Sequence, residues 1–249
     1  MKKILIPISI ILGIAAGVFM FAASRGQAEA DNGFSLVREA GSVRYKESAD
    51  QDYADMPADE ISLPAGSFVQ TSEGAFARIF LPDNSLISLS ENTEVQVVWD
   101  DSTVSIQQLV GKTWNRVQSV TSGGEFTVET PSAVAAVRGT IFGVDVIDSE
   151  TSVYVTEGDV DVTRFLLREG VKRPDQTISL TGNEHADVLP EGQLQKRPVR
   201  DDEKTRLWFR RNRAIDQIFE RLRSEDPVNL RRRLMLELSD FEARGRNAF

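Results

Sequence analysis

The sequence predicts a mainly β protein with a helical appendage at its C-terminus. Apolar and polar residues alternate in many short runs, for example over Tyr154–Val162, and this period of two is typical of a half-buried strand. Gly, Asn, Asp and Pro recur between these runs at a spacing of about 8–12 residues, which is typical of an all-β domain. Beyond residue 200 the apolar spacing changes to three and four, the period of a helix.

The first half of the chain is rich in predicted strands. Residues 34–45 predict two short strands around a turn at Gly41, and residues 46–60 predict a solvated acidic loop. Six further strands are expected, with a turn at Gly111 between the last two: Ser67–Thr71, Phe76–Leu81, Leu86–Leu89, Glu94–Trp99, Ser102–Leu109 and Lys112–Val117. The pattern indicates an antiparallel sandwich, roll or short solenoid.

The most distinctive segment spans residues 130–162. Two strand-like runs flank a break at Arg138-Gly139-Thr140, and Gly158 marks the turn of a second hairpin. We expect Gly139 to permit the backbone turn and Arg138 to pair with an acid of the body. Direct contact between Arg138 and a partner is the alternative.

This segment resembles the FecR domain of bacterial envelope proteins. The resemblance extends over about residues 34–162, with upstream support from residues 65–71 and 77–89. It implies a FecR-like β-domain. Members of that family act as transmembrane regulators of iron-siderophore uptake, relaying an outer-membrane receptor signal to an extracytoplasmic-function sigma factor. The motif residues in this chain are Pro131, Arg138, Gly139, Thr140, Phe142 and Gly158.

The N-terminus has the pattern of a targeting segment. Two lysines precede Ile4–Ala23, a stretch without charge, and Ala28-Glu29-Ala30 offers a signal-peptidase pattern. Residues 1–30 therefore predict a signal peptide, or a hydrophobic helix that anchors the chain in the inner membrane. Either alternative localises the body outside the cytoplasm, as a periplasmic, secreted or anchored protein. We expect the family's cytoplasmic sigma-factor-binding domain to be absent, because so few residues precede the apolar stretch.

The composition argues against an enzyme. The chain of 249 residues has no cysteine, which excludes disulfides, thiolate metal sites and a cysteine nucleophile. Its single histidine, His185, lies in a polar run and is expected to be solvated. The carboxylates between Asp145 and Asp161 lack the spacing of a calcium loop, so we expect them on solvated strand faces. We therefore predict no metal, no cofactor and no catalytic residues.

The C-terminal region differs from the body in charge. Residues 31–195 carry 11 basic and 27 acidic side chains, whereas residues 196–249 carry 15 basic and 10 acidic ones. Residues 163–198 predict an extended β or linker segment, and residues 201–245 predict a basic amphipathic helical hairpin. Each predicted helix has an apolar stripe, the first at Trp208, Ile215, Phe219 and Leu222 and the second at Leu230, Leu234, Leu238 and Phe241.

The basic hairpin is the best candidate for an interaction surface. We expect it to dock on its own acidic body or on a protein partner in the envelope; contact with an anionic membrane is the alternative, and nucleic-acid binding is not expected of an exported acidic protein. The predicted function is a non-catalytic recognition or signalling module, with a structural scaffold or a polysaccharide-binding protein as alternatives. The candidate partner-binding residues are Trp208, Arg210, Arg211, Arg231, Arg232 and Arg233.

Overall fold

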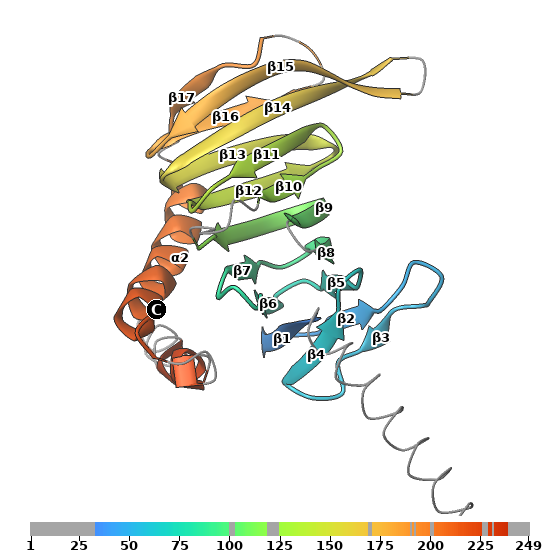
Figure 1. Cartoon of the computed structure of the whole chain (residues 1–249), viewed down its shortest axis with the longest axis vertical. Helices are drawn as coiled ribbons and strands as arrows, with labels where there is room; N and C mark the ends of the chain where they lie inside the picture. Colours follow the sequence, from blue (N-terminus) through green and yellow to red (C-terminus); the bar gives the residue numbers. More distant parts are fainter. Residues whose placement is uncertain are drawn as a thin grey trace, which may run out of the picture.

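Two β-sheets face each other in the computed structural model, and helix α2 (Glu203–Leu222) lies along one side of them (Figure 1). The structure describes residues 33–99, 103–118, 125–168, 171–189, 191, 193–199, 202–225, 229–230 and 232–238. In these ranges no helix is long and apolar enough to cross a membrane. The predicted N-terminal hydrophobic segment, residues 1–30, lies outside the described residues.

The first sheet is antiparallel throughout its described strands. Its strands follow the order β4 (Glu60–Pro64), β1 (Gly33–Ala40), β6 (Phe76–Phe80), β7 (Leu86–Leu89), β9 (Thr103–Arg116), β12 (Ile141–Ile147), β13 (Glu150–Glu157), β16 (Glu184–Val188) and β17 (Lys196–Pro198).

The second sheet contains the one parallel pairing of the described strands, between β9 and β10. Its order is β3 (Ala54–Asp55), β2 (Val43–Lys46), β5 (Phe68–Thr71), β8 (Glu94–Trp99), β9, β10 (Glu125–Glu129), β11 (Ala133–Val137), β14 (Asp159–Arg168) and β15 (Val171–Thr181). The mainly β prediction is therefore confirmed, whereas a purely antiparallel domain is not.

Strand β9 belongs to both sheets and corrects one predicted boundary. The sequence predicts two strands separated at Gly111, but the structure has one strand that bends there. Residues 103–110 pair in the second sheet and residues 111–116 in the first. Gly111 adopts φ +88°, and a Cβ at this position would lie 2.5 Å from the carbonyl oxygen of Asn92. Glycine therefore lets the strand cross between sheets rather than end.

The main core lies between the two sheets and is built by alternate residues of their strands. Strand β5 shows this alternation, because Val69 is buried while its neighbours Phe68 and Gln70 are partly exposed. The alternating valines Val144 and Val160 are also fully buried. The predicted extended or linker segment, residues 163–198, belongs to this body. It contains the end of β14 and the strands β15, β16 and β17.

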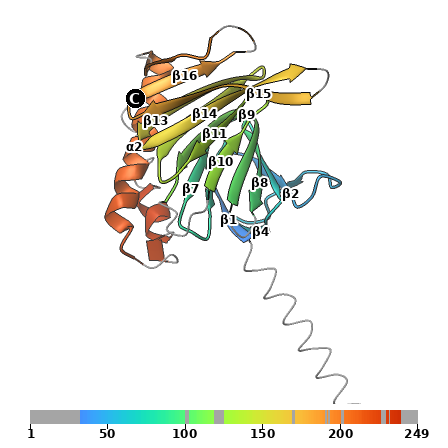
Figure 2. The same ribbon diagram turned by 45° about the horizontal axis from the view of Figure 1, so that its top comes forward.

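Helix α2 covers the outer face of the first sheet (Figure 2). For this reason β12 is buried on both faces from Ile141 to Val146, although its pattern predicts a half-buried strand. Residues 229–230 and 232–238 are also helical. Leu230, Leu234 and Leu238 join one apolar cluster with α2 and with residues of β1, β6 and β7. Residues 226–228, residue 231 and the residues beyond 238 lie outside the described residues.

Candidate functional site

Helix α2 begins with a side-chain cap and presents one apolar face to the sheet. The Asp202 carboxylate accepts a hydrogen bond from the Thr205 backbone N–H at 2.9 Å, which satisfies one of the free donors of the first turn. Of the predicted stripe, Ile215, Phe219 and Leu222 are buried and Trp208 is partly buried, and the neighbouring Phe209 is buried as well. The predicted stripe is thus confirmed, and it packs against the β-domain as well as against the following helical residues.

An aromatic cluster fixes the N-terminal half of α2 to the sheet. The Phe209 ring lies edge-on to Trp114 at 5.0 Å between centroids, and the Trp208 ring lies edge-on to Trp114 at 5.4 Å. Both also contact Tyr154 edge-on. Beneath them, a Cβ at Gly143 would lie 2.3 Å from the Trp208 ring. Gly143 therefore provides the space into which the indole fits.

His185 belongs to the same cluster, so the prediction of a solvated histidine is wrong. Its ring is 2% exposed and stacks on Tyr154 at 5.4 Å, with 8° between the planes. Strand β16 pairs with β13, and the register sets His185 opposite Tyr154. The polar residues around His185 resemble a loop in sequence, but they form a strand whose outward face is covered. The histidine therefore has a packing role.

Asp216 links the helix to the sheet below the aromatic cluster. Its carboxylate accepts a hydrogen bond of 3.0 Å from the Trp114 indole N–H. Burial raises the pKa of Asp216 to about 6, although nearby Arg116 and the indole N–H favour the charged form. This carboxyl group therefore titrates close to neutral pH and can change the strength of helix docking.

Two arginine-centred groups hold the rest of the interface. Arg116 pairs with Glu220 and lies over the Phe219 ring at 5.0 Å. Arg78 is fully buried and pairs with Glu39. Glu39 also pairs with Arg211, at 3.3 Å, and Arg211 lies over the Phe76 ring at 3.5 Å. Arg211 is thus committed to the interface with the chain's own body.

A cleft of about 710 Å³ opens beside this interface, between α2 and the edge of the first sheet formed by β16 and β17. Three exposed arginines of α2 line it, Arg206, Arg210 and Arg213, at helical spacings of four and three. Phe209 and Val199 supply apolar walls. Asn183, Thr205 and Gln217 supply polar groups, and none of the described lining residues is acidic. This basic cleft is a candidate binding site on the described surface.

The distinctive 130–162 segment forms structural turns. Gly139 and Gly158 adopt φ +75° and +82°, where non-glycine residues are strained. The buried Thr140 hydroxyl donates to the Asp159 backbone oxygen at 3.0 Å, tying the two turns together. The Phe142 ring is buried edge-on to Phe126. The predicted turn at Gly139 is confirmed.

The other two residues of the motif have different surroundings. Pro131 is partly buried and begins the turn between β10 and β11, where the Thr130 N–H donates to the Ala133 backbone oxygen at 2.8 Å. Arg138 is exposed. The sequence predicts that Arg138 pairs with an acid, but within the described ranges no ion pair joins Arg138 to an acidic side chain. Arg138 is also not among the residues that line the basic cleft.

The structure separates the predicted partner-binding residues. Arg210 lines the basic cleft, whereas Trp208 and Arg211 contact the chain's own β-domain. Arg232 and Arg233 are exposed beyond the C-terminal end of α2, and Arg233 pairs with Glu225. Arg231 lies outside the described residues. Sequence reasoning did not assign Asn183, Val199, Thr205 or Gln217 to a site, because only the folded chain brings β16–β17 beside α2.

In the part of the chain that the structure describes, no group of three or more His, Asp or Glu side chains is arranged to hold a metal ion. The basic cleft itself offers positive charge, hydrogen-bonding groups and apolar contact.

Comparisons with known proteins found a matching family and similar solved structures. The model of the FecR protein family matches residues 67–161. No curated protein matches the chain. Two crystal structures of a proposed anti-sigma factor from Parabacteroides distasonis are similar, each with 22% identity and a TM-score of 0.47 over 57% of this chain. The matches span 64% and 63% of those chains, which is less than two thirds of their length.

Proposed function

We propose that the protein is a non-catalytic recognition module that acts outside the cytoplasm and binds a protein partner through the basic cleft. The match of residues 67–161 to the FecR protein family supports a signalling or regulatory role. The cleft carries the proposal: it is concave, it combines cationic, polar and apolar walls, and it is held by a helix that is docked on its own domain. A concave surface that carries clustered positive charge favours a partner of complementary, negative charge.

Two further observations support this function. The aromatic stripe of α2 is buried against Trp114 and Tyr154, so the helix is a fixed wall of the site. The location outside the cytoplasm is supported by the two N-terminal lysines followed by the uncharged stretch Ile4–Ala23.

Crosslinking in intact cells tests the proposal. We would introduce a photo-crosslinking amino acid in place of Gln217, which is exposed and lines the cleft, and in a matched variant in place of Val171, which is exposed on β15. Proteinase treatment of spheroplasts would report on which side of the inner membrane the domain lies. We expect a protein adduct from position 217 only, and degradation of the domain by the added proteinase. Equal adducts from both positions, or a proteinase-resistant domain in intact spheroplasts, would contradict the proposal.

A further inference from the structure

The arginines of the basic cleft are arranged as a row. Arg206, Arg210 and Arg213 recur at spacings that place them on one face of α2, and all three are exposed and line the cleft. Arg213 also lies over the Phe209 ring at 5.4 Å. Guanidinium groups bind carboxylates in a bidentate manner, so this row matches several carboxylates along an extended ligand.

The remaining walls match a peptide chain. Asn183 and Gln217 carry side-chain amides, which both donate and accept hydrogen bonds and therefore suit a peptide backbone. Pro198, Val199 and Ala214 offer apolar contact. Backbone-matching amides, apolar walls and a cationic row together favour a peptide that carries acidic and apolar side chains.

The shape and the charge of the chain disfavour other anionic ligands. A planar membrane surface reaches protruding side chains more easily than the walls of a cleft, and the wall beside α2 is formed by Asn183, Pro198 and Val199. A nucleic acid would be repelled by a chain whose formal net charge is −9. A protruding peptide segment can enter a cleft, and because it carries far fewer negative charges than a nucleic acid, the net charge of the chain repels it less.

We propose that the basic cleft binds an acidic peptide segment of the partner protein, so that Arg210 and Arg213 pair with its carboxylates. The inference rests on the recognition function proposed above and adds the chemical class of the ligand.

Fluorescence anisotropy with a labelled peptide tests it. The full-length chain, kept in detergent micelles, is titrated into a labelled peptide rich in Glu and Leu, and into the same peptide with Gln replacing Glu. We expect the Gln peptide to bind at least about tenfold more weakly, because charge-assisted hydrogen bonds are lost. Arg210→Glu and Arg213→Glu should weaken binding of the acidic peptide by a similar factor.

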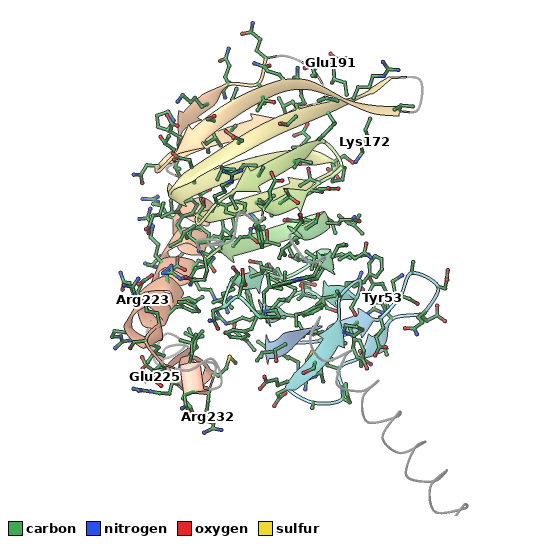
Figure 3. All side chains as sticks on the ribbon, viewed as in Figure 1. Tyr53, Lys172, Glu191, Arg223, Glu225 and Arg232 are labelled. Carbon is green, nitrogen blue, oxygen red and sulfur yellow. The ribbon has the colours of Figure 1, made fainter. Side chains whose placement is uncertain are left out.

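Arg223→Glu is the matched control. Arg223, labelled in Figure 3, is the exposed C-cap residue of the same helix and is not among the residues that line the cleft. This variant should keep the affinity within about twofold, since an exposed ion pair contributes little. Far-ultraviolet circular dichroism of all variants verifies folding.

Equal affinity for the Glu and Gln peptides would overturn the inference, and so would a loss of affinity in Arg223→Glu as large as in Arg210→Glu and Arg213→Glu. Displacement of the acidic peptide from the wild type by phosphatidylglycerol vesicles would also overturn it, because it would indicate a lipid site. A protein adduct at position 217 without acidic-peptide binding would leave the recognition function standing and reject only the ligand class. Absence of both would reject the two proposals together.

Discussion

At the scale of single residues, Gly143 shows how one missing side chain permits docking of the helix. The Trp208 ring occupies the space that a Cβ would need, and the same ring lies edge-on to Trp114 and Tyr154. If alanine replaced Gly143, the indole would have to move away from the new methyl group and would lose these contacts. Glycine is retained here for space rather than for a special backbone conformation, since its φ is not positive.

Gly143→Ala should therefore lower the free energy of unfolding by about 1–3 kcal/mol, the usual cost of overpacking. Urea unfolding followed by tryptophan fluorescence measures it. In a Trp208→Ala background the same change should cost much less, because the clashing ring is gone. An equal cost in both backgrounds would contradict the packing described here.

Asp216 gives a pH-dependent test of the same interface. Its pKa in the folded protein is about 6, above the ordinary value of 3.8. The folded state therefore binds more protons than the unfolded state between these values, and the contribution of Asp216 to stability falls as pH rises from about 4 to about 6. The shift corresponds to about 3 kcal/mol.

Asp216→Asn removes this titration. We expect the difference in the free energy of unfolding, Asp216→Asn minus wild type, to rise by about 2 kcal/mol between pH 4 and pH 7. Urea titrations at several pH values measure the difference, in which contributions of unaffected carboxyl groups cancel. A difference that is constant across this range would show that Asp216 is not titrating in a buried environment.

At the scale of elements, the docking of α2 is the main departure from a simple sandwich. Strand β12 is buried on both faces because the helix covers it, and the buried Phe219 packs in a cluster with Val37, Phe80 and Leu86. The helix is therefore part of the folded body.

Phe219→Ala should lower the free energy of unfolding by about 3–5 kcal/mol, as for other buried phenylalanines. Leu207→Ala, at a 46% exposed position of the same helix, is the control and should change stability by less than about 0.5 kcal/mol. Chemical unfolding of the two variants provides the comparison. If both variants were as stable as the wild type, the helix would not be docked as described.

The sequence predicts elements better than it predicts their surroundings. The alternation of Val144 and Val146 and the helical spacing of Ile215 and Phe219 identify strands and helix because these patterns are local. The burial of His185 is not predictable in this way, since it depends on Tyr154 and on a helix that covers both.

At the scale of the whole molecule, the basic cleft exists because distant segments meet. Its walls come from α2 and from the region of β16 and β17, and the sheet order brings the latter next to β13. The charge contrast between an acidic body and a basic C-terminal region is visible in the sequence. The concave site is not, because it depends on the position of the helix relative to the sheet edge.

Amide hydrogen exchange on the full-length chain tests the central claim most directly, namely that α2 is docked on the β-domain and forms a wall of a peptide-binding cleft. We predict that amides of residues 209–222 exchange slowly in the free protein, because docking stabilises the helix. Addition of the acidic peptide should slow exchange further at residues 205–217 and 196–199. Exchange of α2 at the rate of an unstructured chain, with or without the peptide, would contradict the account.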